Sequence, residues 1–111
     1  MRHDRGEVWW GPTPQKDTPS YRPWLILSTD DHPFADAECI AAAMTTQRHD
    51  EGLKVPDDVW IEGGANVRSH VSPWHVATFK YHLFDRRQGR LREEFVGRAA
   101  EQLHAYVPTT R

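Results

Sequence analysis

Short runs of apolar residues along the chain predict a series of β-strands. We expect a first strand over residues 6–10, with Val8 and Trp10 on one face. Residues 22–28 contain the unbroken apolar run Trp24-Leu25-Ile26-Leu27, which is typical of a strand that is buried on both faces. Weaker patterns predict further strands over residues 38–46, 59–61, 66–72 and 74–81. The chain is therefore rich in β-structure.

Two of these segments contain residues that strands use less often. Ala41-Ala42-Ala43 favours a helix by propensity, but Ile40 and Thr45 flank it, so we predict a strand whose small side chains allow a neighbouring strand or subunit to approach closely. Pro73 separates the last two segments and predicts a bulge or an edge, because proline lacks the backbone donor that a ladder needs.

The C-terminal segment has a different period and predicts a helix. From Arg92 onward apolar residues recur every three or four positions, which places them on one helical face. Glu93 and Glu94 suit the first turn, His104 suits the last, and Pro108 ends the helix. Several short strands followed by one helix predict a mainly β fold, a small barrel with a packed C-terminal helix.

A loop of about ten residues is expected between the first two strands. Residues 11–21 contain Pro12, Pro14 and Pro19 among polar residues, and this composition disfavours a strand. Loops of this length in small domains are usually functional or mobile.

Length and composition indicate one folded domain over residues 1–111, with its core at about residues 5–107. A single cysteine, Cys39, rules out an internal disulfide and favours a reducing compartment. No apolar run is long enough to span a bilayer, and no secretory signal is visible, so we expect a cytoplasmic protein without a membrane partner.

The net charge of −2 argues against a surface that coats nucleic acid broadly. It leaves room for a local basic site, since five basic residues gather near the end of the chain, namely Lys80, Arg86, Arg87, Arg90 and Arg92. Taken alone, this cluster is interpreted as a solvated loop. Most of the five tryptophans, Trp24 and Trp74 among them, are expected in the core or an interface.

The order of these elements, with particular residues at their junctions, resembles the MazF/PemK toxins. The first strand of that family commonly opens with Arg-Gly-Asp/Glu, which here is Arg5-Gly6-Glu7. An Arg-Pro pair then starts the apolar second strand, here Arg22-Pro23, and the third strand ends in a threonine before a small residue, here Thr45-Thr46. The resemblance covers nearly the whole chain and rests on the order and spacing of these motifs.

The resemblance implies an SH3-like barrel of the CcdB/PemK toxin type and a homodimer that cleaves single-stranded RNA without metal or other cofactor. It also implies a cognate antitoxin as partner. In such toxins the arginine of Arg-Pro and the threonine after the third strand face the scissile phosphate, so Arg22 and Thr45 are the catalytic candidates, with Thr46 as second choice. Without the family, an arginine paired with a surface carboxylate and a threonine chosen for its β-propensity would explain both residues.

One part of the family pattern is missing. Many members carry an Arg-Thr pair after an acidic residue late in the sheet, and the arginine is Ala77 here, while the acid is Trp74. Histidine titrates near neutral pH, so His75 is the candidate general base and His70 the second choice. A metal site at these histidines is not expected, because no cysteine or acidic residue stands at a coherent spacing.

Binding of RNA is assigned to polar, basic and aromatic residues near these positions, namely Lys16, Tyr21, Thr46, His70, Arg86 and Arg87. The alternative keeps the fold and drops the chemistry: a non-catalytic SH3-like module that binds nucleic acid or regulates a protein partner. The missing arginine and acid favour this alternative, and the presence of Arg22 and Thr45 opposes it.

Overall fold

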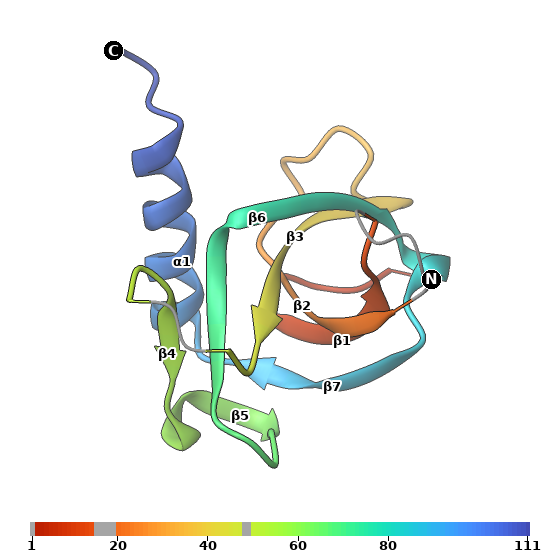
Figure 1. Cartoon of the computed structure of the whole chain (residues 1–111). Helices are drawn as coiled ribbons and strands as arrows, with labels where there is room; N and C mark the ends of the chain where they lie inside the picture. Colours follow the sequence, from red (N-terminus) through yellow and green to blue (C-terminus); the bar gives the residue numbers. More distant parts are fainter. Residues whose placement is uncertain (1, 15–19, 48–49) are drawn as a thin grey trace.

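Seven antiparallel strands form one curled sheet in the computed structural model, which describes residues 2–14, 20–47 and 50–111. The order within these residues is β4-β6-β3-β2-β1-β7-β5. Figure 1 shows the sheet closing into a half-barrel with the helix α1 against one side. The bounds are β1 Glu7–Pro12, β2 Tyr21–Ile26, β3 Glu38–Thr45, β4 Leu53–Val55, β5 Trp60–Gly63, β6 Ser69–Lys80, β7 Arg86–Leu91 and α1 Glu93–Tyr106. The predicted mainly β fold with a C-terminal helix is confirmed.

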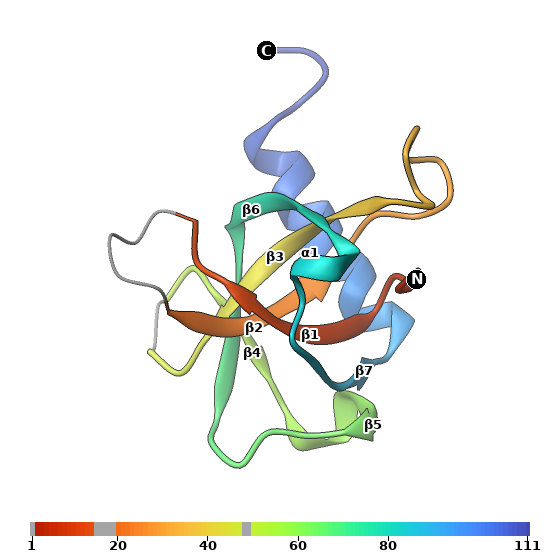
Figure 2. The same ribbon diagram turned by 90° about the vertical axis from the view of Figure 1, so that its right-hand side faces the viewer.

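The longest strand, β6, produces much of the curl. Its partner on β3 changes register between Ala42 and Ala43, which pair with Val76 and Ser72, so three residues of β6 lie in a bulge. Bulges bend a strand and increase its twist. Pro73 is one of the three, and Figure 2 shows β6 turning sharply across the sheet. The predicted irregularity at Pro73 is therefore confirmed, although one bent strand replaces the two separate strands that we predicted.

The two faces of the sheet bury different cores. The helix-side core lies between the sheet and α1, and it includes Val8, Leu25, Met44, Phe95 and Val96. The aromatic core fills the opposite face and comprises Trp24, Ile26, Cys39, Ala41, Ala43, Phe79, Tyr81 and Phe84. Strands β2 and β3 lie in the middle of the sheet and contribute to both cores, which explains their continuous apolar sequences.

The alanines of β3 are fully buried because bulky neighbours cover both faces of the strand. Ala41 and Ala43 belong to the aromatic core, and Ala42 belongs to the helix-side core. Ala43 pairs directly with Trp24, so the small residue makes room for the indole. Tertiary packing thus overrides the helical propensity of this segment, as we predicted.

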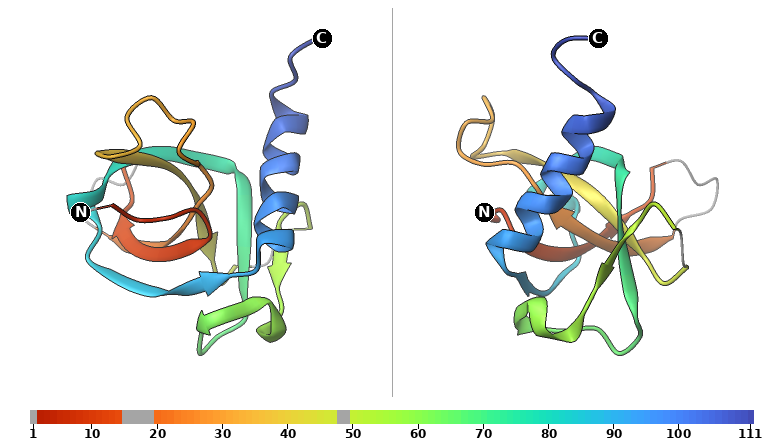
Figure 3. Two further views of the ribbon diagram at one scale, coloured as in Figure 1. Left: turned by 180° about the vertical axis from the view of Figure 1, so that it is seen from behind. Right: turned by 90° about the vertical axis from the view of Figure 1, so that its left-hand side faces the viewer.

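The helix packs its apolar stripe against the bent strand β6, and Figure 3 shows the two elements side by side. Phe95, Val96 and Ala99 are its buried residues. The observed bounds, Glu93–Tyr106, agree with the predicted helix. No helix in the described part of the chain is long and apolar enough to cross a membrane.

Other predictions from the pattern were wrong. The basic segment expected as a solvated loop contains β7, which pairs with β1 and β5. The sequence of β7 is mostly charged and polar and shows no apolar alternation, so its pattern did not predict a strand. Trp74 was expected in the core, but it is 43% exposed and packs edge-on against Tyr106 of the helix. The short strand β4 was missed, because its three residues are too few for a pattern.

Strands β5 and β7 pair so closely that two glycines are required. A Cβ atom on Gly89 would collide with the carbonyl oxygen of Glu62 and lie 2.9 Å from the ring of Trp60. Gly63 has a φ of 69°, a left-handed conformation that side chains rarely adopt. These glycines fix the position of β7 at the edge of the site described below.

We expect Gly89→Ala to lower the free energy of unfolding by about 2 kcal/mol or more, because backbone atoms must move to accommodate the methyl group. Gly97→Ala is the matched control: a Cβ there meets nothing within 4 Å, and the position lies inside α1. This control should gain about 0.5–1 kcal/mol, since alanine favours a helix. Urea unfolding measures both changes, and equal effects of the two substitutions would contradict the close approach of β5 and β7.

Candidate functional site

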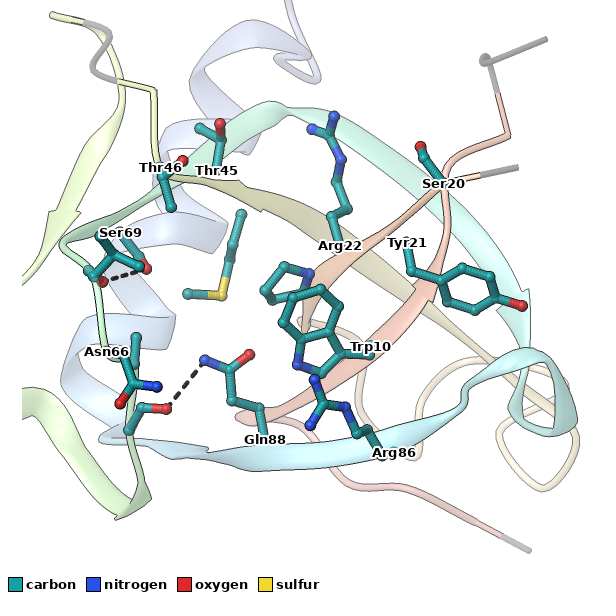
Figure 4. A pocket seen from close by; sticks show the side chains of 15 residues that line it. Trp10, Ser20, Tyr21, Arg22, Thr45, Thr46, Asn66, Ser69, Arg86 and Gln88 are labelled. Carbon is teal, nitrogen blue, oxygen red and sulfur yellow. Dashed lines mark hydrogen bonds between the residues drawn. The ribbon is translucent and has the colours of Figure 1, made fainter. Parts of the chain in front are cut away.

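A cavity of about 550 Å³ opens where β2 begins and β3 ends (Figure 4). Its walls come from β1, β2, β3, β7 and the segment that leads into β6. Five residues proposed from the sequence line it, namely Tyr21, Arg22, Thr45, Thr46 and Arg86. The fold therefore brings together residues that lie far apart in the chain.

Arg22 and Thr45 meet because of the register between β2 and β3. Trp24 pairs with Ala43, and continuing this antiparallel register by two residues places Arg22 beside Thr45. Figure 4 shows both side chains pointing toward the same rim of the cavity, away from the indole of Trp10. A guanidinium and a hydroxyl donor thus stand next to each other at the mouth of the cavity.

The two candidate histidines lie outside the cavity, on the aromatic-core side of the same end of the sheet. His70 is the cross-strand partner of Thr45, is 8% exposed, and has no hydrogen-bond partner for its Nδ1 atom among the described residues. The ring of His75 contacts Trp24 edge-on, with 5.4 Å between the ring centroids. Burial and the positive charge of Arg22 lower the pKa of His75, so its neutral form is favoured.

The two arginines of β7 have different partners. The guanidinium of Arg86 lies over the ring of Trp10 at 4.9 Å from the centroid, a cation–π contact on the cavity wall. Arg87 instead forms ion pairs with Glu62 at 3.2 Å and Glu7 at 3.7 Å. These carboxylates hold Arg87, and raise its pKa further, so Arg86 is the better placed of the two to meet a ligand.

The sequence reasoning missed several residues of the cavity, namely Trp10, Ser20, Asn66, Ser69 and Gln88. Gln88 and Trp10 reach the cavity through the pairing of β1 with β7, and β7 was not recognised as a strand. Asn66 lies in the connection before β6 and has no local motif that would single it out. Lys16, which we predicted to bind RNA, lies outside the described residues.

The cysteine of the chain is buried away from solvent. Cys39 lies in the aromatic core, and burial raises the pKa of its thiol to about 12, so the thiolate needed for nucleophilic attack is scarce at neutral pH. Among the described residues, no three His, Cys, Asp or Glu side chains come together as a set that could hold a metal ion. The polar side chains at the cavity are hydroxyls, amides and the guanidinium groups of Arg22 and Arg86.

A comparison with protein-family models identifies the family of this chain. Residues 4–107 match the model of the PemK-like, MazF-like toxin of type II toxin-antitoxin systems. The chain belongs to this family. A comparison with curated protein sequences found no significant match.

Solved structures agree with this assignment at the level of the fold. MazF in a MazE–MazF complex from Deinococcus radiodurans superposes with a TM-score of 0.74 at 14% identity, covering 96% of this chain and 97% of the other. An endoribonuclease in complex with its cognate antitoxin from a mycobacterial species gives 0.69 at 17% identity, with 98% of each chain covered. The Mycobacterium tuberculosis toxin MazF-mt6 gives 0.66 at 23% identity, covering 91% and 95%.

The histidines predict a pH dependence of stability. The pKa of His75 is lowered, and burial also lowers the pKa of His3, which stacks on Trp9 at 3.7 Å between centroids. In the unfolded chain both histidines have the ordinary pKa of about 6.5. Below that pH the unfolded state therefore binds more protons than the folded state, and the free energy of unfolding should decrease as pH falls from 7.5 to 5.5.

Urea unfolding at several pH values in this window measures the effect. His3→Phe keeps an aromatic ring against Trp9 but cannot titrate, so it should flatten the slope. Val107→Phe, at the exposed position that follows α1, changes no titratable group, so it is the control and should leave the slope as it is. A wild-type stability that rises toward pH 5.5 would contradict the lowered pKa values.

Proposed function

We propose that this chain is a toxin-type endoribonuclease that cleaves single-stranded RNA through the 2′-hydroxyl of its substrate and without a metal ion. The observation that carries the proposal is the placement of Arg22 beside Thr45 at the rim of a cavity of about 550 Å³. Membership of the MazF-like family supports it. The known neighbours with antitoxins bound support a cognate antitoxin as the natural inhibitor.

In the proposed reaction the 2′-oxygen attacks the adjacent phosphorus, and the bond from phosphorus to the 5′-oxygen breaks. The intermediate phosphorane carries extra negative charge. The guanidinium of Arg22 binds two of its oxygens at once, and the Thr45 hydroxyl donates a further hydrogen bond. The products are a 2′,3′-cyclic phosphate and a 5′-hydroxyl.

His75 is proposed as the group that takes the proton from the 2′-hydroxyl. Its lowered pKa keeps the imidazole neutral at neutral pH, and a general base must be neutral to accept a proton. The charge of Arg22 helps to lower this pKa, so the two residues lie near each other at one end of the sheet. A proton must also reach the leaving 5′-oxygen, and His70, beside Thr45, is the second candidate for proton transfer.

Further residues are proposed to hold the RNA chain. Tyr21, which is 52% exposed at the cavity, offers a ring on which a base can stack, and Arg86 and Thr46 offer donors. Lys16, His70 and Arg87 keep the RNA-binding role proposed from the sequence. A homodimer would join two such sites, and a cytoplasmic location would give access to cellular RNA.

The second candidate function is a non-catalytic binding module. It is favoured by Ala77 and Trp74, which replace the arginine and the acid of many relatives. A nuclease and a binding module would both use the same cavity, so cleavage of RNA distinguishes the two functions.

Arg22→Ala should lower the rate of RNA cleavage by about a hundredfold or more, because a donor to the developing charge is lost. Arg22→Lys should restore little of it, since an ammonium cannot hold two oxygens in one plane. Arg98→Ala is the control, because Arg98 lies on α1 over Phe95. End-labelled RNA resolved on gels gives the rates.

The same assay tests the chemistry. Cleavage should persist in excess EDTA, leave a 2′,3′-cyclic phosphate, and stop when the nucleotide 5′ of the cut is 2′-deoxy. A requirement for divalent metal or equal cleavage of the deoxy strand would overturn the mechanism. Binding of RNA without any cleavage by the wild-type protein would favour the binding module.

His75→Ala should reduce the rate by about 10²–10⁴ and remove the acidic limb of the pH–rate profile, which we expect below the ordinary histidine pKa of about 6.5. His82→Ala is the matched control, since His82 is exposed and lies in the short helical turn Tyr81–Leu83. An unchanged profile in His75→Ala would discard His75 as the base and leave the role of Arg22 untouched.

A further inference from the structure

We propose that Lys54 binds the RNA phosphate next to the scissile one, so that the RNA backbone crosses the strands at this end of the sheet. This inference rests on the proposed function and adds a residue and a direction to the path of the substrate. It is carried by a row of directly opposed residues on four adjacent strands, the cross-strand row, namely Arg22, Thr45, His70 and Lys54.

The register of the strands defines the cross-strand row. His70 on β6 pairs with Thr45 on β3 and, on its other side, with Lys54 on β4. Arg22 lies beside Thr45 in the register of β2 with β3. Opposed residues of antiparallel strands lie on a line perpendicular to the strands. Adjacent strands are about 4.8 Å apart, so the backbone of Lys54 lies about 10 Å from that of Thr45, on the side away from Arg22.

All side chains of the cross-strand row point to the same face of the sheet. On β4, Leu53 and Val55 flank Lys54 and pack against the helix-side core. On β6, Val71 follows His70 and packs against the same core. Successive residues of a strand point to opposite faces, so Lys54 and His70 point away from the helix. Directly opposed residues share a face, which places the whole row on the other side of the sheet.

The cations at the two ends of the row are available to a ligand. Lys54 is exposed, and no carboxylate within the described ranges forms an ion pair with Lys54 or with Arg22. Lys80, at the opposite end of β6, is instead held by Glu38 at 3.2 Å. The row therefore begins and ends with a positive charge that the protein itself does not neutralise.

The middle of the row leaves room for an RNA backbone. The Thr45 hydroxyl oxygen accepts a hydrogen bond from the backbone N–H of Gln47 at 3.1 Å, so its own proton is available to a phosphate. His70 is only 8% exposed, so its ring does not stand between Thr45 and Lys54 as a barrier. RNA carries one phosphate per nucleotide. A phosphate held by Arg22 and Thr45 therefore leaves Lys54 facing the next phosphate along the chain.

Lysine suits this second position. Its ammonium is a compact charge on a long flexible stem, so it can follow a phosphate whose position varies with the sequence of the RNA. The bidentate arginine stands where the geometry of the reacting phosphate matters. A lysine on an edge strand such as β4 also discourages pairing with other chains, and this role alone would not affect RNA binding. Measurements of RNA binding separate the two roles.

Fluorescence anisotropy with a labelled 2′-fluoro RNA oligomer, which has no 2′-hydroxyl to attack, tests the contact without relying on cleavage. Lys54→Gln should weaken binding about fivefold at about 0.1 M salt, because one phosphate contact on a single strand contributes a slope of about 0.7 to the dependence of log affinity on log salt concentration. The slope should fall by the same amount. Lys54→Arg keeps the charge and should retain both affinity and slope.

Lys80→Gln is the matched control. It removes the same charge from the opposite end of β6 and should leave the affinity and the slope close to those of the wild type. Equal affinities and slopes for Lys54→Gln and the wild type would overturn the proposal. An equal loss in Lys54→Gln and Lys80→Gln would also overturn it, because the effect would then reflect net charge.

Uncharged methylphosphonates at single positions identify the phosphate. In a 2′-fluoro oligomer that carries a mapped cleavage sequence, one of the two phosphates that flank the scissile one should be the partner of Lys54. Replacing that phosphate should weaken binding of the wild type about fivefold and leave binding of Lys54→Gln unchanged, since the contact is already lost. The same loss in both proteins at both positions would show that Lys54 contacts neither phosphate.

Kinetics keep this inference distinct from the cleavage mechanism. A contact with a neighbouring phosphate is present before and during the reaction, so Lys54→Gln should raise KM about fivefold and leave kcat unchanged. A loss of kcat at constant KM would place Lys54 at the scissile phosphate and overturn the proposal. If the wild type does not cleave RNA, weaker and less salt-dependent binding by Lys54→Gln still supports the contact, and unchanged binding rejects it even in an active nuclease.

Discussion

The pairing of Trp24 with Ala43 across β2 and β3 is the constraint on which the site depends. A fully buried indole needs a methyl-sized neighbour opposite it, and Ala43 provides one. The register that follows brings Arg22 beside Thr45 two residues further along. A slip of one residue would turn the side chain of Thr45 to the helix-side face, because alternate residues of a strand face opposite ways. Core packing thus sets the geometry of the proposed phosphate site.

The same end of the sheet offers different chemistry on its two faces. Arg22 and Thr45 lie at the rim, with His70 and His75 on the aromatic-core side. Trp10, Gln88 and their neighbours form the cavity beyond the helix-side core. Successive residues of a strand point to opposite faces of the sheet, so the end of one strand can present side chains on both faces. The proposed phosphate site and the cavity are therefore separated by a single layer of backbone.

The bulge in β6 bears on the residues that depart from the family pattern. The three residues between the Ser72 and Val76 pairs are released from the ladder, so Trp74 reaches Tyr106 on the helix while His75 contacts Trp24. Ala77, the position at which the resemblance leads us to expect an arginine, packs against the aromatic core.

The sequence determined the features that depend on local periodicity and on the order of motifs. Four features could be found without a structure: the period of α1, the apolar run of β2, the irregularity at Pro73, and the candidate residues Arg22 and Thr45. These signals are local because backbone geometry alone sets the spacing of residues on one face. The resemblance to the toxin family rests on the same local motifs, taken in their order along the chain.

Only the tertiary structure decided how distant segments combine. The cavity needs β7, whose charged sequence hides a strand that becomes visible only when β1 and β5 pair with it. Gln88 is an ordinary polar residue until Gly64, more than twenty residues earlier, fixes its amide. The exposure of Trp74 likewise follows from a bulge and a helix that no local pattern couples. Side-chain surroundings depend on strand pairing between remote parts of the chain, and a single sequence carries no direct record of that pairing.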